Sequence, residues 1–274
     1  MLRSLYSGVS GMRGFQTKLD VIGNNIANVN TVGFKAGRVM FKDILSQTVS
    51  GVSAPTAEKG GVNSKQIGLG VTVSAIDTLH TPGSAMTTNK PTDLRIDGDG
   101  FFAVSPALDG AEGPYLTRAG NFDLDAERRL VNADGLFVLG TDGQGITLDP
   151  AVTAFSISQS GEIVAVQADG TAAPTGQFIA VAKVVNPAGL EKIGGNLYRS
   201  TPNSNVDPID LGTSLANDPA TGTGAIVSGQ LEMSNVDLTS EFTEMIIAQR
   251  GFQSNSRIIT TSDEVLQEVV NLKR

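Results

Sequence analysis

The stretch DLTSEFTEMIIAQRGFQSNSRIITTSDEVLQEVVNLKR, residues 237–274, contains a single glycine and no proline. Proline is the strongest helix breaker, so a run of this length without it predicts one continuous helix with Asp237 as its N-cap. A helix over 238–273 would be on the order of 54 Å long at ~1.5 Å per residue, well above the globular average. Lys273 and Arg274 complement the negative end of its dipole.

Apolar residues recur every seven positions along this helix and form a seam: Leu238, Met245, Phe252, Ile259 and Leu266. The alternate seam position starts at Phe242 and ends at Val270 but is polar between them. A second apolar stripe on another face contains Ile258, Val265, Val269 and Leu272. A helix that is apolar on more than one face must be covered on more than one side. The pattern therefore favours packing between molecules, while a helical hairpin packed within one chain is the alternative.

The N-terminal segment repeats the design, with Leu5, Met12, Leu19 and Ile26 spaced by seven and Phe15, Ile22 and Val29 in a second row. All eleven prolines fall between Pro55 and Pro219, so this end is also free to be helical. Its four glycines each lower the intrinsic helicity by up to ~1 kcal/mol relative to alanine. Residues 1–45 carry six basic and two acidic side chains, and residues 237–274 carry four basic and six acidic ones. We therefore expect the two ends to attract each other and to pair as an α-helical coiled coil.

The residues on these apolar rows are our candidates for an assembly interface. They are Leu5, Met12, Leu19, Ile22, Ile26, Leu238, Phe242, Met245, Phe252, Ile259, Leu266 and Val269. In an isolated molecule, glycine-containing heptads with an uncovered second stripe cannot offset an ordering cost of roughly 1 to 2 kcal/mol per residue. The sequence predicts that both ends are disordered in the soluble monomer and become helical on assembly.

The middle of the chain is typical of β structure. Between residues 93 and 198, short apolar runs alternate with turn signals such as DGDG, RAGN and GTDG, which arrive every 8 to 15 residues. This rhythm favours antiparallel hairpins in a compact all-β domain over alternating strands and helices. Residues 46–90 are small and polar around a strand-like centre at 69–76, which predicts an extended connector.

The predicted fold class is therefore α+β, with three parts. A discontinuous helical domain is expected from residues 1–45 and 233–274, because these ends carry the heptads. The extended connector follows at 46–90, and the all-β domain occupies 91–232.

Composition argues against an enzyme and against a nucleic-acid binder. The net charge of −8 disfavours contacts to phosphates. The absence of cysteine excludes disulfides, thiolate metal sites and a cysteine nucleophile, and His80 is the only histidine. We predict no catalytic, cofactor-binding or metal-binding residues. No apolar run approaches the ~20 residues that span a bilayer, so no membrane insertion is expected.

Local patterns that suggest chemistry have simpler structural interpretations. The stretch GDGFFA from Gly98 matches a dinucleotide fingerprint, but a strand-like run follows it, which favours a turn. Asp123 and Asp125 alternate beside a turn and are interpreted as solvated acids rather than as a carboxylate pair. His80 lies in a polar stretch and is interpreted as a solvated side chain. The asparagines that precede Gly33 are interpreted as ending a helix and turning the chain.

Both ends resemble a known family. LDVIGNNIANVNTVGFK at residues 19–35 and SNVDLTSEFTEMIIAQRGFQSNSRIITTSDEVLQEVVNL at 234–272 resemble the paired terminal signatures of bacterial flagellar axial proteins, the rod and hook subunits. DLRIDGDGFFAV, YLTRAGNFDLD and GGNLYRS in the middle also resemble this family, so the likeness covers nearly the whole chain. Within the family, the stretch at residues 246–274 is most similar to hook proteins, and the full chain resembles the short flagellar hook proteins of Gram-positive bacilli. Residues 46–66, in contrast, resemble the extra stretch of distal rod proteins.

The resemblance implies a structural subunit of the flagellar hook. Such subunits assemble into a hollow helical tube that transmits motor torque to the filament as a flexible joint. The alternative is the distal rod of the basal body, which is a stiff drive shaft. A more distant alternative is a secreted β domain that binds a ligand and is oligomerised by its helices. The absence of Trp and the presence of only three Tyr offer little material for glycan binding.

The resemblance also implies a route and partners. Subunits of this family are exported unfolded by type III export, without a cleaved signal peptide, and assemble at the growing tip under a cap. The expected partners are further copies of this chain, the adjacent rod and hook–filament junction proteins, the hook cap and the export apparatus. The terminal helices would form the inner tube and the β domain an outer layer. The expected location is extracellular, in the hook or the rod of the flagellum.

Overall fold

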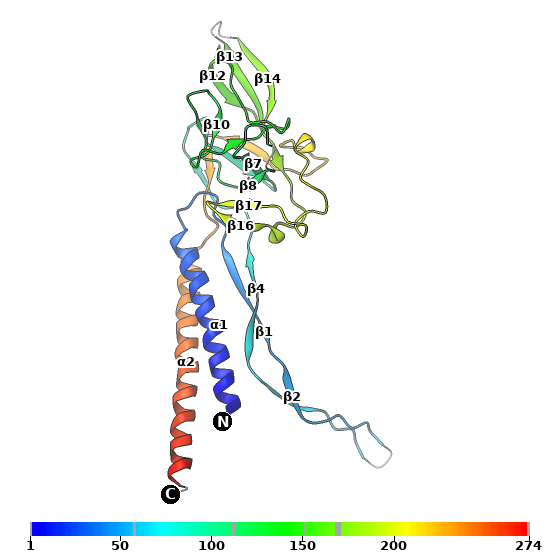
Figure 1. The fold of residues 1–274 in the computed structure, drawn as a ribbon, viewed down its shortest axis with the longest axis vertical. Coiled ribbons are helices and arrows are strands. Elements are labelled where there is room, and N and C mark those ends of the chain that lie inside the picture. The colour runs from blue at the N-terminus through cyan, green and yellow to red at the C-terminus, as the bar shows by residue number, and fades with distance from the viewer. Residues whose placement is uncertain (1, 57–58, 111–112, 151, 168–170, 273–274) are drawn as a thin grey trace. The chain divides into compact units, whose positions relative to one another are not determined.

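The computed structural model describes residues 2–56, 59–110, 113–150, 152–167 and 171–272 (Figure 1). The chain separates into two compact units. The first unit contains Met1–Ala27, Gly37–Thr78 and Asp237–Arg274, and the second contains Asn28–Ala36 and Leu79–Val236. Lys273 and Arg274, which are expected to complement the dipole of the long helix, lie outside the described residues.

Two long helices dominate the first unit: α1 (Leu2–Ala27) and α2 (Leu238–Asn271), which lie side by side in Figure 1. Asp237 caps α2, because its carboxylate accepts a hydrogen bond from the backbone N–H of Thr239. The predicted helices at both ends are thus confirmed. Val29 does not belong to its predicted helical row, because α1 ends at Ala27 and the chain turns there.

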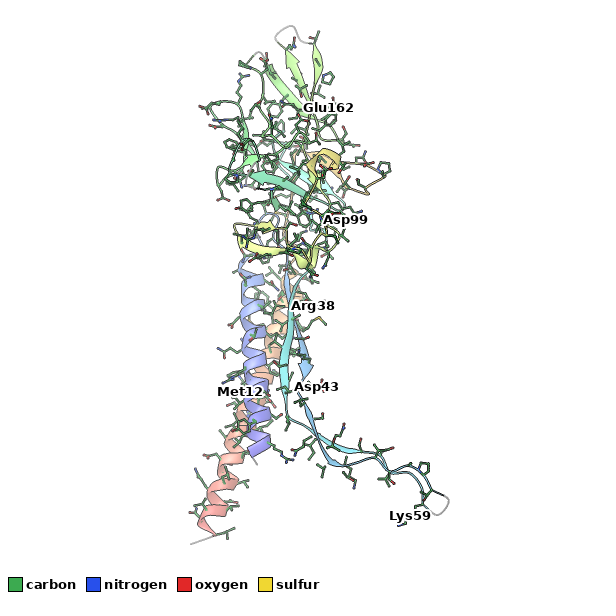
Figure 2. The ribbon with its side chains drawn as sticks, turned by 45° about the vertical axis from the view of Figure 1, so that its right-hand side comes forward. Met12, Arg38, Asp43, Lys59, Asp99 and Glu162 are labelled. Carbon is green, nitrogen blue, oxygen red and sulfur yellow. The ribbon has the colours of Figure 1, made fainter. Side chains whose placement is uncertain are left out.

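The first unit also contains a long two-stranded ribbon. Strand β1 (Gly37–Asp43) pairs antiparallel with β4 (Val71–Thr78), and β2 (Ser46–Ser50) pairs with β3 (Lys65–Gly68). Isolated bridges from Ser53 to Val62 and from Thr56 to Lys59 extend the pairing. Figure 2 shows Lys59 near the tip of this ribbon. The stretch predicted as an extended connector therefore contains paired strands, and its residues 57–58 lie outside the described ranges.

The second unit is built mainly of antiparallel strands. In its described residues, the largest sheet has eight strands in the order β16-β17-β8-β7-β11-β10-β9, with β15 also paired to β7. In chain order these strands are β7 (Phe101–Ser105), β8 (Tyr115–Thr117), β9 (Asp123–Leu124), β10 (Leu130–Val131), β11 (Phe137–Val138), β15 (Val181–Ala182), β16 (Glu191–Gly194) and β17 (Leu197–Arg199).

Smaller sheets complete this unit. One has three strands: β12 (Val152–Ile157), β13 (Glu162–Gln167) and β14 (Ala172–Phe178). Two further pairs join distant parts of the chain: β6 (Leu94–Asp97) with β18 (Ala225–Ser228), and β5 (Ala85–Thr87) with β19 (Gln230–Glu232). Short 3-10 turns lie at η1 (Pro187–Gly189) and η2 (Leu211–Thr213).

The hydrophobic core of the second unit is centred on β7. Phe102 is fully buried, and its ring meets that of Phe122 edge to face at 5.3 Å between centroids. The turn that precedes β7 places Gly98 and Gly100 at positive φ, where a side chain would be strained. GDGFFA therefore contains this turn and the first three residues of β7, which confirms the prediction that a strand and not a helix follows the turn. Two terminal helices with antiparallel strands between them confirm the α+β class. Among the described residues, neither helix is long and apolar enough to cross a membrane.

Candidate functional site

Glycines line the seam between α1 and α2. A Cβ at Gly8 would lie 3.4 Å from Cγ1 of Ile259, and one at Gly11 would lie 2.7 Å from Nδ2 of Asn255. On the other helix, a Cβ at Gly251 would lie 2.6 Å from the Phe15 ring. The glycines let the two backbones approach closely, so their role is packing as well as reduced helicity. Gly8 and Gly11 are three residues apart and therefore share one helical face, which is the signal that could have revealed this role, whereas a Cβ at Gly14 would meet Phe41 of β1 instead.

Polar groups tie the two helices together. The Lys18 ammonium lies 2.5 Å from the carboxylate of Glu244, as the opposite charges of the two ends predict. Asn25 is buried, donates 2.8 Å and 3.2 Å hydrogen bonds to the Gly37 carbonyl and Glu241, and accepts one from the Gly37 N–H. Burial raises the pKa of the Glu241 carboxyl above its usual value. Asn25 therefore fixes the start of β1 against α1 and α2, a role that the interpretation as a helix-ending residue missed.

Most of the surface of α2 is open to solvent. Among its described side chains, Ala248 alone is buried. The half-buried residues recur every three or four positions and form the row that faces α1: Glu241, Glu244, Met245, Gly251, Asn255, Ile259, Ser262 and Leu266. The pairing with α1 thus covers one face of α2 and leaves the others uncovered in the single chain.

Two apolar stripes flank this row, one on either side of it by helical periodicity. The proximal stripe consists of Leu238, Phe242, Ile246 and Phe252, and the distal stripe of Ile247, Ile258, Val265, Val269 and Leu272. All of these residues are exposed: Phe242 is 50% and Val265 is 46% accessible. Monomeric soluble proteins seldom expose contiguous apolar surface of this kind, and such surface marks an interaction site.

The structure divides the predicted interface residues into two groups. Ile22 is buried, and those that face the partner helix or β1 are half-buried: Leu5, Met12, Leu19, Ile26, Met245, Ile259 and Leu266. Leu238, Phe242, Phe252 and Val269 are exposed. Figure 2 shows Met12 on α1, beside the ribbon that carries Arg38 and Asp43. The first group is occupied within one chain, whereas the second remains available, and the role of both in assembly stays a prediction.

A cluster of buried charges lies in the second unit. The Glu232 carboxylate is 1% exposed and lies 2.5 Å from the Lys35 ammonium and 3.2 Å from the Arg118 guanidinium. Lys35 also donates to the carbonyl of Thr81 at 2.7 Å, and Arg118 donates to the carbonyl of Gly98 at 2.8 Å. Burial alone would raise the pKa of Glu232, but the attraction of Arg118 and Lys35 outweighs it, so this pKa lies below its usual value.

The sequence did not reveal this cluster. Phe34-Lys35-Ala36 and Leu231-Glu232-Met233 each place a single charge between uncharged neighbours. Ala182-Lys183-Val184 has the same pattern and its lysine is exposed, so the pattern alone does not identify a buried charge.

His80 lies beside this cluster and corrects the interpretation of a solvated histidine. Its ring packs edge to face against Phe101 and Tyr198, at 5.6 Å and 5.5 Å between centroids. Burial and the positive charges of Lys35, Arg118 and Lys192 lower the pKa of His80 to about 4. Burial also raises the pKa of Tyr198 to about 12. Both rings are therefore uncharged at neutral pH and act as packing groups.

The remaining candidates for chemistry form ordinary surface ion pairs. The Asp123 carboxylate lies 2.6 Å from the Lys90 ammonium, and that of Asp125 lies 3.1 Å from Arg129. These acids are at or near the surface, in agreement with their interpretation as solvated turn residues. In the described part of the chain, no three His, Asp or Glu side chains gather in a group that could hold a metal ion.

Three family models match separate parts of the chain. A model described as "Flagella basal body rod protein" matches residues 5–35, and "Flagellar hook protein FlgE/F/G D1 domain" matches residues 95–165. The third, "Flagellar basal body rod FlgEFG protein C-terminal", matches residues 227–272. Helix α2, most of α1, strands β7 to β11 and the three members of the buried charge cluster fall within these matches.

Curated relatives match over the full length. The flagellar basal-body rod protein FlgG of Bacillus subtilis (strain 168) is 57% identical, with all of both chains covered. FlgG of Caulobacter vibrioides is 37% identical over 99% of this chain and all of the relative. The flagellar hook protein FlgE of Borreliella burgdorferi is 31% identical, with both chains covered in an alignment of 453 positions. On these matches, the chain belongs to the family of bacterial flagellar rod and hook proteins, a structural family rather than a family of enzymes.

Proposed function

We propose that this chain is a subunit of the distal rod of the bacterial flagellum and polymerises into a tube through α1 and α2. The observation that supports polymerisation is the pair of exposed apolar stripes on α2. Burial of apolar surface contributes about 25 cal/mol per Å², so covering both stripes with neighbouring copies strongly favours a polymer. A tube has neighbours on several sides of each helix, which is the arrangement that stripes on both flanks require.

The comparisons favour the rod over the hook, to which the resemblance of the C-terminal stretch points. FlgG relatives align over 275 and 276 positions, close to the 274 residues of this chain. The FlgE relatives need 453 and 474 positions, so hooks of that type carry sequence that this chain lacks. The stretch that resembles distal rod proteins, residues 46–66, lies in the ribbon formed by β2 and β3. A short hook protein is the second candidate, favoured by the resemblance of residues 246–274.

In this proposal, the parts of the chain have separate tasks. Residues 1–45 and 233–274 form the inner tube, with α1 and α2 paired as a coiled coil. Residues 46–90 are the connector, and residues 91–232 form an outer layer. The partners are further copies of the chain, the adjacent rod and hook–filament junction proteins, the hook cap and the export apparatus. The location is the flagellar basal body, reached by type III export without a cleaved signal peptide.

The first experiment tests polymerisation with substitutions on two different sides of α2. Val265→Asp places a charge in the distal stripe, and Thr260→Asp places the same charge on the polar side that carries Gln253, Ser256 and Gln267; both positions are exposed. Negative-stain microscopy of concentrated protein should show tubes for the wild type and for Thr260→Asp, but none for Val265→Asp. Tubes from Val265→Asp, or discrete oligomers from the wild type, would contradict the proposal.

The second experiment separates rod from hook. Antibody labelling of isolated flagella, before and after removal of the external parts, locates the protein within the axial structure. A rod subunit is retained within the part that crosses the cell envelope. Label on the curved segment outside the envelope would instead establish the hook.

A further inference from the structure

Three stretches that are distant in the sequence meet within the second unit. The backbone N–H of Gly33 donates to the carbonyl of Glu232 at 2.8 Å. The N–H of Ala36 donates to the Asn235 side-chain carbonyl at 2.8 Å, and the N–H of Leu79 donates to the Ala36 carbonyl at 2.8 Å. Residues 33–36 follow α1, and residues 232–235 precede α2. The segments that lead to the two helices are therefore docked together within the second unit, which we call the β unit.

The charges at this meeting point are unequal. Among the described residues, Glu232 is the one anion paired with the two buried cations Lys35 and Arg118, which are 1% and 4% exposed. One carboxylate oxygen receives the Lys35 ammonium and the N–H of Gly83 at 3.0 Å, and the other receives Arg118. The other titratable groups nearby add no negative charge at neutral pH, because His80 and Tyr198 are neutral and a lysine such as Lys192 is never negatively charged.

The order in which these charges are buried matters. If residues 33–36 docked without Glu232, a second unpaired cation would enter the interior beside Arg118. An unpaired buried charge is strongly destabilising, because desolvation is not offset by a partner. With Glu232 in place, the same docking completes an ion triad. Glu232 can dock without Lys35, since Arg118 alone neutralises it, so the dependence runs in one direction.

We propose that Glu232 is a latch that makes the docking of residues 33–36 conditional on the arrival of the C-terminal segment. A chain that is made or exported from its N-terminus presents residues 33–36 first and Glu232 much later. Until then, the segment that leads to α1 stays undocked, and the start of the chain is not fixed before its end is present. Residues 33–36 and the segment that contains Glu232 thus dock together. The latch is a property of the single chain and does not depend on the proposed assembly.

Hydrogen exchange of the full chain at neutral pH tests the latch. The reporters are the amides of Gly33, Ala36 and Leu79, whose acceptors survive the substitution Glu232→Gln. In Glu232→Gln these amides should exchange about 100-fold faster, as expected when a buried pair is broken, while amides of β7 change less than about threefold. The contrast between reporters and core distinguishes undocking of the segment from general destabilisation.

A double-mutant cycle with Lys35→Met separates a charge latch from simple packing. Lys35→Met removes one of the two cations that Glu232→Gln leaves unpaired, so Glu232→Gln in this background should accelerate the reporters about tenfold less than it does in the wild type. If Glu232→Gln unfolds the whole unit, adding Lys35→Met should raise the stability of the unit, although Arg118 stays unpaired. Equal effects of Glu232→Gln in both backgrounds, equal acceleration in β7 and the reporters, or failure of this rescue would each overturn the proposal. None of these measurements requires a polymer, so failure of the rod assignment leaves the result intact.

Discussion

Strand β7 and helix α2 both carry many apolar side chains, but those of β7 are buried and most of those of α2 are exposed. All five residues of β7 are buried beneath neighbouring strands of the second unit. In α2, 34 residues long, Ala248 is the one buried residue among those described. The β unit completes its own core, whereas the helix pair leaves apolar surface uncovered.

This difference indicates where each region obtains its stability. A side chain that is already buried contributes to the folding of the single chain. A side chain that is still exposed contributes only when a neighbour covers it. We therefore expect substitutions in the β unit to act on the free chain, and substitutions on the flanks of α2 to act on the polymer.

The largest effect is expected from the same substitution made in both regions. Phe102→Ala removes a fully buried ring and should lower the unfolding free energy of the β unit by about 3–5 kcal/mol. Phe242→Ala removes a half-exposed ring of the proximal stripe and should change the stability of the free chain by less than about 0.5 kcal/mol. Thermal unfolding followed by circular dichroism measures both. A large loss of unfolding free energy for Phe242→Ala in the monomer would mean that the flanks of α2 already stabilise the free chain, which would contradict this expectation.

Acid should weaken the β unit through His80. Its pKa is about 4 in the fold and about 6.5 in an unfolded chain, so between these values the unfolded chain binds a proton that the folded one does not. Stability is unaffected above pH 6.5 and falls as the pH approaches 4. Allowing for the partial exposure of His80, the loss is about 2 kcal/mol.

The control for the pH dependence is His80→Gln, which cannot titrate. Urea unfolding at several pH values should show a shallower slope between pH 6.5 and 4 for this variant. Glu232 loses its charge only at more acidic pH, because its pKa lies below the usual value. An unchanged slope in His80→Gln would assign the acid sensitivity to other groups.

A smaller effect is expected where two glycines of the helix pair differ in surroundings. Gly251→Ala places a Cβ 2.6 Å from the Phe15 ring and should destabilise the assembled helices by about 1–2 kcal/mol. A Cβ at Gly23 meets no atom within 4 Å among the described residues, so Gly23→Ala should instead stabilise α1 by up to about 1 kcal/mol. The helical dichroism of the polymer on heating measures both. If both substitutions stabilised the helices, the glycines would act only through their low helix propensity and not through close packing.

The sequence predicts the helices and the turns because both depend on short-range pattern. The absence of proline, the heptads and Asp237 define α2 almost to the residue, and Gly98 and Gly100 mark the turn before β7. Exposure on both flanks of α2 was also predictable, because helical periodicity separates the stripes without knowledge of the partner.

Features that depend on long-range pairing were not predicted. The partner of Lys35 lies 197 residues away, and no local pattern specifies a contact at that separation. The strand-like centre predicted at residues 69–76 matches β4, but β2 and β3 are too polar to show the alternation of a half-buried strand, because every residue in both is exposed. The half-buried position of His80 likewise depends on Phe101 and Tyr198, which are distant in the sequence.

Loss of the ribbon is expected to change the stability of the free chain least of all. Shortening residues 50–64 removes exposed residues and should alter the stability of the monomer by less than about 0.5 kcal/mol. In the polymer, however, Val52 and Val62 and the open strand edges are available to neighbouring copies. We expect shortening to change the curvature or stiffness of the tube without preventing export, as measured from the bending of tubes in electron micrographs.

Replacing Val52 and Val62 by Thr keeps the length of the ribbon and removes its apolar contacts, so this variant separates an effect of length from an effect of those contacts. Unaltered bending in both variants would mean that the ribbon has no mechanical role and that the stripes of α2 suffice to hold the tube.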